Sequence, residues 1–231
     1  MENDYYKVTK DLIHTGLDAI SKSIKECEKK ARVRESIFSD LQEAGIAVRK
    51  RSDWKAKKAP GTDGEDWNYL AIVIHHAGNS YSCDNDGEVK MRQAEETDIK
   101  SFNHLSYHYA IDCTGIIYEA LDIREKGAHL KGANTGKIGI VFLSDFSLPG
   151  EASQYGPSRW GSLSEFAGQV KDNWDSSVDI PTTNQKKSID VLVKTLIKFF
   201  PITQLGGHRE FASLNDLGRA CPGTYGLQIP A

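Results

Sequence analysis

Apolar positions near the N-terminus recur with the period of an α-helix. Six of them follow one another at spacings of 4, 3, 4, 3 and 4: Ile13, Leu17, Ile20, Ile24, Cys27 and Ala31. Such spacings place the six side chains on one seam of a helix, which we predict over residues 9–34. A second short helix is predicted over residues 36–44. It would end at Gly45, because glycine readily adopts the left-handed conformation that follows a helix.

Further along the chain, β-prone runs alternate with one more helix. Residues 69–75 (YLAIVIH) form an almost unbroken hydrophobic run, which predicts a strand buried on both faces. This segment is the best candidate for the central strand. Residues 107–112 and 116–121 flank a Cys-Thr-Gly turn and predict a hairpin, and residues 138–144 predict another buried strand. Residues 183–200 carry apolar side chains on one helical face before Pro201. The alternation of strands and helices indicates an α/β (α+β) protein.

The predicted elements fall into two parts. Residues 49–68 are charged and contain Pro60, Gly61 and Gly64, so we place a boundary there, between a helical extension (1–48) and a domain (49–231). Within the domain, residues 145–181 are rich in Ser and Gly and predict a surface insertion with one helix near residues 163–174. The apolar seam of the extension must be buried somewhere. We expect it to pack against the domain, with self-association or docking onto a partner protein as alternatives.

Composition excludes several classes of protein. The chain has 231 residues, 39% of them hydrophobic and 26% charged, as in globular proteins. A net charge of -3 provides no field that would attract nucleic acid, and no apolar run approaches the ~20 residues needed for a membrane span. The N-terminus has acidic residues where a Sec signal peptide needs basic ones, so we expect no cleaved signal. Four cysteines are too few and too scattered for a disulfide framework, and we expect Cys27 to be a core residue.

Two histidines and a cysteine are candidate metal ligands. His75 ends the first buried run, His208 lies in GGHRE after a short strand-like segment, and Cys221 lies in RACPG. Two imidazoles and one thiolate suit zinc, and three protein ligands leave a fourth position open, as in catalytic zinc sites. The spacing is not that of a compact zinc motif. The alternative, a buried free cysteine and two unrelated histidines, therefore stays open at this point.

Four segments resemble the zinc amidase family, which comprises N-acetylmuramoyl-L-alanine amidases, phage amidase-type lysozymes and peptidoglycan recognition proteins. They are IVIHHAGNS (72–80), SYHYAIDCTGIIYEALD (106–122), KGAHLKGANTGKIGIVFLS (126–144) and GGHREFASLNDLGRACPG (206–223). The resemblance covers residues 49–231. It implies a central mixed β-sheet flanked by helices, to which residues 1–48 add a helical extension.

The resemblance also implies roles for particular residues. The family's zinc ligands fall on His75, His208 and Cys221, and its catalytic tyrosine falls on Tyr107. On a pleated strand His76 faces away from His75, which favours a structural role for His76.

Three further positions match the family less closely. Arg219 stands where phage-type members carry a catalytic lysine, and His129 and Asn134 match residues that line the substrate groove. The animal recognition proteins often have a disulfide in the loop after the first ligand. Only Cys83 is present in that loop here, so we expect this disulfide to be absent.

The function that the resemblance implies is zinc-dependent hydrolysis of the amide between N-acetylmuramic acid and L-alanine in peptidoglycan, and hence degradation of the bacterial cell wall. The main alternative is a non-catalytic recognition protein that binds peptidoglycan, although such members typically lose the cysteine ligand. A cysteine peptidase that uses Cys221 and His208 is a third alternative. Without a signal peptide, we expect delivery to the cell wall by a holin or a secretion machine, or else a recycling role in the cytoplasm.

Overall fold

The computed structural model describes residues 2–78, 83, 86–151, 179–212 and 220–229. The chain divides into two compact units, residues 1–39 and 40–231. Arg219 and the helix expected near residues 163–174 lie outside the described residues. Among the helices that the structure describes, none has both the length and the apolar character needed to cross a bilayer.

The N-terminal segment forms one helix where we predicted two. Helix α1 (Glu2–Glu43) runs through residues 34–36, where the sequence contains neither glycine nor proline to interrupt it. Its end agrees with the prediction. Gly45 has a φ of 75°, and the N–H groups of Gly45 and Ile46 donate to the carbonyls of Gln42 (2.9 Å) and Leu41 (3.0 Å). This is the Schellman arrangement, which satisfies the last carbonyls of a helix.

In the described part of the chain, the strands form one six-stranded sheet in the order β1-β4-β3-β5-β2-β6. The strands are β1 (Val48–Arg49), β2 (Ala71–His76), β3 (Tyr109–Ile111), β4 (Ile117–Glu119), β5 (Lys137–Phe142) and β6 (Gln204–Gly207). β3 and β4 form the predicted antiparallel hairpin, and the other neighbouring strands are parallel. The mixed sheet is therefore confirmed. β2 is buried and interior, but it lies one place from the edge, because only the short β6 follows it.

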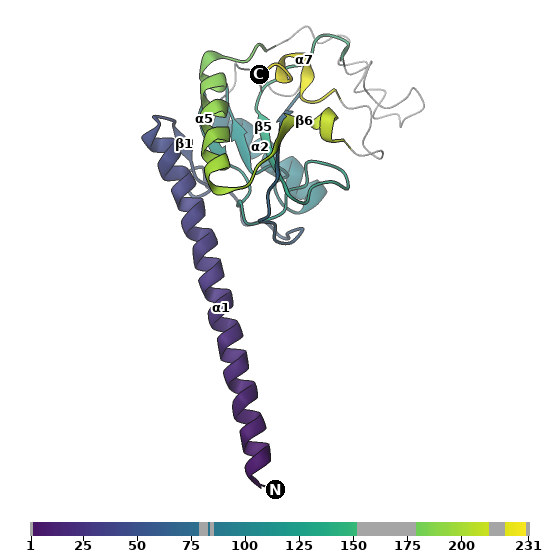
Figure 1. The fold of residues 1–231 in the computed structure, drawn as a ribbon. Coiled ribbons are helices and arrows are strands. Elements are labelled where there is room, and N and C mark those ends of the chain that lie inside the picture. The colour runs from purple at the N-terminus through teal and green to yellow at the C-terminus, as the bar shows by residue number, and fades with distance from the viewer. Residues whose placement is uncertain (1, 79–82, 84–85, 152–178, 213–219, 230–231) are drawn as a thin grey trace, which may run out of the picture. The chain divides into compact units, whose positions relative to one another are not determined.

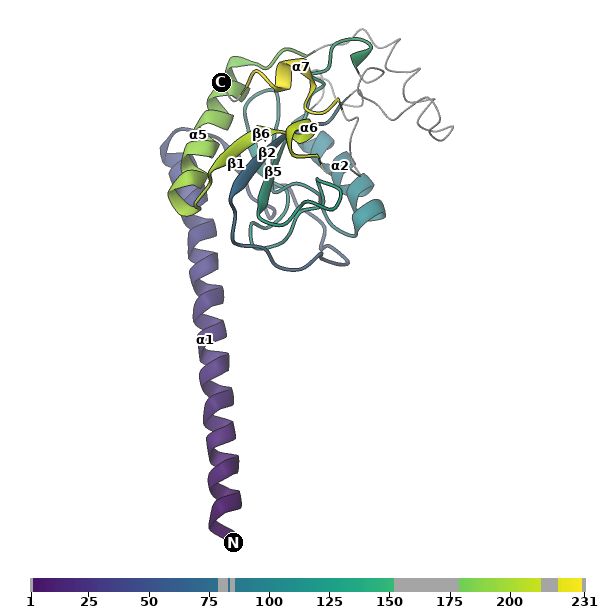
Figure 2. The same ribbon diagram turned by 45° about the vertical axis from the view of Figure 1, so that its right-hand side comes forward.

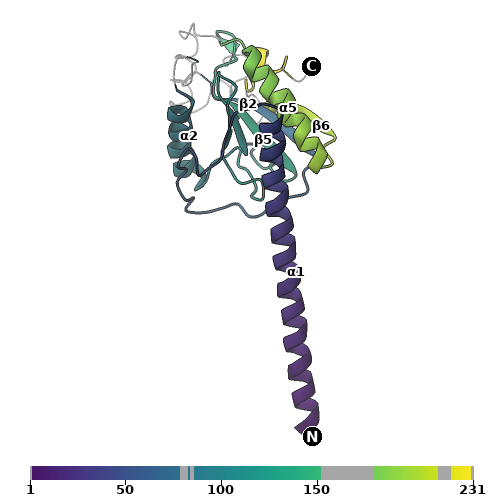
Figure 3. The same cartoon turned by 90° about the vertical axis from the view of Figure 1, so that its left-hand side faces the viewer.

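Helices cover both faces of this sheet. Figures 1 and 3 show α2 (Gly87–Phe102) on one face and α5 (Thr183–Phe199) on the other. α5 begins as predicted: the Thr182 side chain accepts a hydrogen bond from the Gln185 N–H, and the Gln185 side chain accepts one from the Thr182 N–H. Two short helices, α6 (His208–Phe211) and α7 (Gly223–Gly226), lie beyond the end of β6 (Figure 2). The α/β (α+β) class is confirmed.

Helix α2 was not predicted, and its buried residues explain why. They include Lys90 and Glu95, so charged side chains interrupt the apolar period on the face that packs against the sheet. Both are satisfied by backbone groups. The Lys90 Nζ donates to the Leu143 carbonyl at 3.0 Å, and the Glu95 carboxylate accepts from the Lys57 N–H at 2.6 Å. Burial of paired polar groups is compatible with a core but leaves no apolar signal in the sequence.

The structure has a disulfide that was not predicted, and one expectation about cysteine was wrong. Cys83 forms a disulfide with Cys113 in the β3–β4 turn, 30 residues away, so a disulfide is present although its partner lies outside the loop after β2. The expectation concerned only a disulfide within that loop, and no local pattern pairs Cys83 with Cys113. Cys27, expected in a core, is exposed on α1.

Candidate metal centre

The three predicted ligands meet at one edge of the sheet. His75 lies near the end of β2, and His208 follows β6 directly as the first residue of α6. β2 and β6 are parallel neighbours, so their carboxyl ends lie together, where ligands of α/β sheets commonly bind. Cys221 precedes α7 and is held close because its carbonyl accepts a hydrogen bond from the Arg209 N–H at 3.2 Å. Figure 2 shows β2, β6, α6 and α7 gathered in this region.

Their donor atoms are spaced as zinc requires. The Nδ1 atoms of His75 and His208 are 3.1 Å apart, and the Cys221 Sγ is 3.5 Å from the His75 Nδ1. The three atoms all lie within 4.8 Å of one another. Ligand atoms ~2.0–2.3 Å from a tetrahedral zinc lie about 3.3–3.6 Å apart. His75 and His208 are buried and Cys221 is half-buried, so the cluster is shielded but not closed.

A neighbouring histidine determines which nitrogen of His75 can bind metal. The His129 Nε2 lies 3.3 Å from the Lys137 carbonyl, which can only accept, so we assign the proton of His129 to Nε2. Burial lowers the pKa of His129 to about 3, which keeps the ring neutral. Its unprotonated Nδ1 then accepts a hydrogen bond from the His75 Nε2 at 3.1 Å. His75 is left with an unprotonated Nδ1 directed at His208 and Cys221.

The protonation of His75 supports the same conclusion. Burial, followed by the proximity of His129 and His208, lowers the pKa of His75 well below its ordinary value. A neutral imidazole is the form that binds metal ions.

Close packing fixes the ring of His129. A Cβ atom at Gly139 would lie 2.5 Å from the His129 Cδ2, so only glycine leaves room for this ring on β5. The contact with His75 was not predicted, since it joins residues 54 positions apart and no local pattern reveals it. The predicted contact of His129 with substrate stays a prediction.

Tyr107 lies against His75, the first predicted ligand. Its ring centroid is 4.9 Å from that of His75, with the two planes at 62°, and it stacks at 6.1 Å on His129. Tyr107 is half-buried, which leaves part of the side chain open. Asn134 is farther along the chain and shapes its own turn, because its Oδ1 accepts from the Leu130 N–H at 2.7 Å. Its predicted contact with substrate also stays a prediction.

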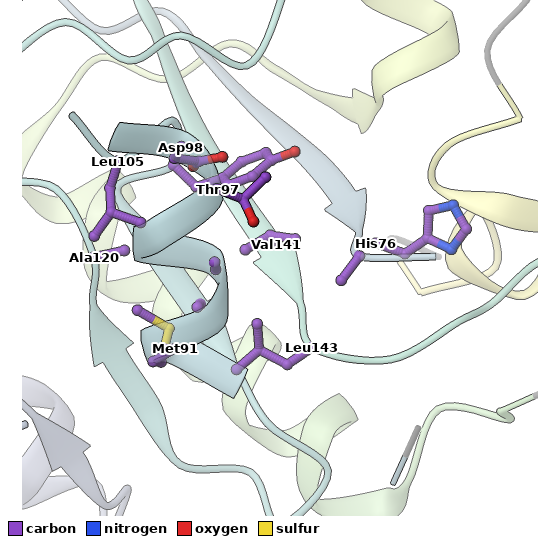
Figure 4. A pocket seen from close by; sticks show the side chains of 12 residues that line it. His76, Met91, Thr97, Asp98, Leu105, Ala120, Val141 and Leu143 are labelled. Atoms are coloured by element: carbon purple, nitrogen blue, oxygen red, sulfur yellow. The ribbon is translucent and has the colours of Figure 1, made fainter. Parts of the chain in front are cut away.

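A cavity of about 180 Å³ adjoins this arrangement; Tyr107 lines it, as does His76, the residue after His75. Figure 4 shows Met91, Thr97 and Asp98 of α2 on the side of the cavity away from His76. Most of the lining is apolar. The volume is below that of sites for drug-sized ligands, so the cavity has room for a small group only.

Two further histidines have structural roles, which the alternation of side chains along a strand predicts for His76. The His76 Nδ1 accepts from the Phe146 N–H at 3.0 Å. The His108 Nδ1 accepts from the Gly139 N–H at 3.0 Å, and its Nε2 lies 3.0 Å from the Glu125 carbonyl. With both nitrogens of His108 occupied by backbone groups, this ring fixes the backbone next to His129.

The chain is similar to known proteins in sequence and in fold. Residues 66–224 match the N-acetylmuramoyl-L-alanine amidase family. Peptidoglycan recognition protein 3 of Mus musculus is 31% identical over 107 residues, which are 45% of this chain and 31% of the mouse protein. The chain thus spans less than a third of that relative's length.

Two solved structures share the fold. Drosophila peptidoglycan recognition protein SD has a TM-score of 0.59 at 20% identity, over 80% of this chain and 93% of that one. An endolysin N-acetylmuramoyl-L-alanine amidase from Clostridium intestinale has a TM-score of 0.50 at 17% identity, over 77% of this chain and 88% of that one. At these identities the likeness shows the architecture, and the function must be argued from the site.

Proposed function

Because the chain belongs to the N-acetylmuramoyl-L-alanine amidase family, we propose that it is a zinc-dependent amidase that cuts the bond between N-acetylmuramic acid and L-alanine in peptidoglycan. One observation carries the proposal: two imidazole nitrogens and one thiol converge at separations that fit zinc, beside a tyrosine. Such a donor set, with three protein ligands, is that of hydrolytic zinc sites.

The residues of this chain would divide the chemistry among them. His75, His208 and Cys221 would hold the metal, which when bound supplies Lewis acidity and lowers the pKa of water to about 7. Tyr107 would donate a hydrogen bond from its hydroxyl to the oxygen of the scissile carbonyl as negative charge develops there. His129 would keep His75 in the tautomer that binds metal, through the contact with its Nε2.

The rival function is recognition of peptidoglycan without catalysis. It is favoured by the relatives in sequence, which are named as peptidoglycan recognition proteins. Against it stands the presence of Cys221 within reach of both histidines, since a protein that only binds glycopeptides needs no thiol at this place. We therefore keep recognition as the second candidate and design the test to separate the two.

The disulfide supports a site of action outside the reducing cytosol. Disulfides form and persist in oxidising compartments, and peptidoglycan also lies outside the cytoplasm. We propose that the protein acts on the cell wall after delivery by a holin or a secretion machine. Recycling of wall fragments in the cytoplasm fits the Cys83–Cys113 disulfide less well.

The proposal is tested by removing and restoring the metal. Chelator-treated protein should release no amino groups from purified peptidoglycan, and one equivalent of zinc should restore the release. Cys221→Ser should lose both zinc and activity. Tyr107→Phe should retain zinc and lose activity on the order of 100-fold or more, because only the donor to the oxyanion is removed.

Two results would contradict it. Hydrolysis by protein shown to contain no metal would remove zinc from the mechanism. Tight binding of peptidoglycan by the zinc-loaded protein, with no product formed, would favour recognition.

A further inference from the structure

Helix α1 carries an apolar seam whose side chains are exposed. All residues from 12 to 29 are exposed, although this segment contains the regularly spaced apolar positions. Ile13, Leu17, Ile20 and Ile24 are 54–58% exposed, and Cys27 is exposed as well. A continuous exposed apolar stripe on a soluble helix indicates an interaction surface.

The period of the seam indicates what kind of surface it is. Alternating spacings of 4 and 3 residues average 3.5, the heptad repeat of a left-handed coiled coil, in place of the 3.6 of a straight helix. In heptad terms, Leu17, Ile24 and Ala31 take the a positions, and Ile13, Ile20 and Cys27 take the d positions. The seam ends where Arg34 takes the next d position.

We propose that α1 pairs with α1 of a second copy of this chain in a parallel, in-register coiled coil. In that arrangement each seam residue meets its own counterpart, so one apolar stripe is complementary to itself. The inference concerns assembly and is independent of whether the domain is catalytic.

The charges beside the seam favour a second copy as the occupant. In a parallel coiled coil, each g position faces the e position five residues later on the other helix. Lys30 at g then faces Glu35 of the second copy, a pair of opposite charges.

The other g and e pairs cause no repulsion. Ser23 faces Glu28 of the second copy, and Gly16 faces Ser21 of the second copy. In the three g and e pairs between Gly16 and Glu35, no like charges therefore meet beside the seam.

Pairing of this kind would join two amidase domains in one assembly. Peptidoglycan is a polymer with repeated sites, so two linked domains would raise the effective concentration of the second site once the first is bound.

The first test is the mass of the full-length protein in solution, measured by sedimentation over a wide range of concentrations. Wild-type protein should have at least twice the mass of one chain. Ile20→Lys should reduce this to the mass of one chain, because it places a charge in the seam. Leu12→Lys is the matched control, since Leu12 is 68% exposed but lies at a c position off the seam, and it should leave the assembly unchanged. A monomeric wild-type protein would overturn the proposal, as would equal dissociation by both variants.

The second test determines the orientation of the two helices. Mild oxidation with a copper phenanthroline reagent should link Cys27 to Cys27 of the second copy, and Cys27→Ser should abolish this crosslink. Ile13→Cys in the Cys27→Ser background should restore a crosslink, because position 13 is also a d position, two heptads earlier. A crosslink at position 27 without one at position 13 would indicate an antiparallel crossing and would overturn the parallel register.

Discussion

His129 is the residue whose place in the structure adds most to the account of the site. Both of its ring nitrogens are used inside the protein, one toward the Lys137 carbonyl and the other toward His75. A backbone carbonyl thus fixes the tautomer of His129, and His129 fixes the tautomer of His75, a predicted metal ligand. The chain of contacts makes the Nδ1 of His75 available before any metal binds.

We predict that His129→Ala weakens zinc binding by about 10–100-fold, because His75 loses the acceptor that orients its ring. The measurement is competition with a chromophoric chelator. Lys137→Ala is the control, since the contact uses the backbone carbonyl of residue 137 and the substitution keeps it. Zinc affinity equal to wild type in His129→Ala would show that His75 needs no support from His129.

The disulfide anchors the chain where it leaves β2. It joins Cys83, which lies between the end of β2 and the start of α2, to Cys113 in the turn between β3 and β4. The Lys90 Nζ on α2 lies 3.9 Å from the Cys113 Sγ and donates to the Leu143 carbonyl. The disulfide therefore joins residue 83 to the β3–β4 turn, and the Lys90 side chain joins α2 to the chain just after β5.

Removal of this disulfide should lower the free energy of unfolding by about 2–4 kcal/mol, because the unfolded chain without the crosslink has a higher conformational entropy. Urea unfolding of wild type with and without reductant would measure the loss, and the Cys83→Ser/Cys113→Ser double variant should show a similar stability. Reductant should have no further effect on the double variant. Unchanged stability of reduced wild type would show that the disulfide contributes nothing to the native fold.

Three buried histidines make the stability of the domain depend on pH. Burial lowers the pKa of His75, of His108 and of His129, to about 4 for His108 and about 3 for His129. Each ring takes up a proton in the unfolded chain near pH 6.5 but stays neutral when folded. Between the folded pKa and the unfolded pKa of each histidine, the unfolded state binds more protons than the folded state. The free energy of unfolding is therefore highest above pH 6.5 and decreases as the pH falls toward 4.

For His108 alone, the loss between pH 6.5 and pH 4 should be on the order of 3 kcal/mol. Urea unfolding of the metal-free protein at several pH values would show a smaller decline in His108→Gln than in wild type. Metal-free protein is needed because zinc on His75 would add its own pH dependence. Equal slopes in the two proteins would mean that His108 is not neutral in the fold or is not buried.

The sequence predicts those parts of the fold that have a local signal. The run before His75, the β3–β4 hairpin, β5 and the capped helix α5 all show a clear period or a clear boundary residue, and all are found. The candidate ligands His75, His208 and Cys221 come from motif resemblance, and the structure brings them together.

What the sequence does not predict depends on contacts between distant residues. α2 was missed because Lys90 and Glu95 are buried through backbone partners rather than through hydrophobicity. The disulfide and the contact between His129 and His75 join residues 30 and 54 positions apart. Such pairs become visible only when the sheet brings the strands side by side.

The most direct test of the central claim is mass spectrometry of peptidoglycan digested by the zinc-loaded protein. Cleavage of the lactyl amide should release intact stem peptides with a new free amino group on L-alanine, and should leave glycan strands without new reducing ends. Fragments cut within the stem, new reducing ends, or the absence of any product would contradict the assignment of this site as an N-acetylmuramoyl-L-alanine amidase.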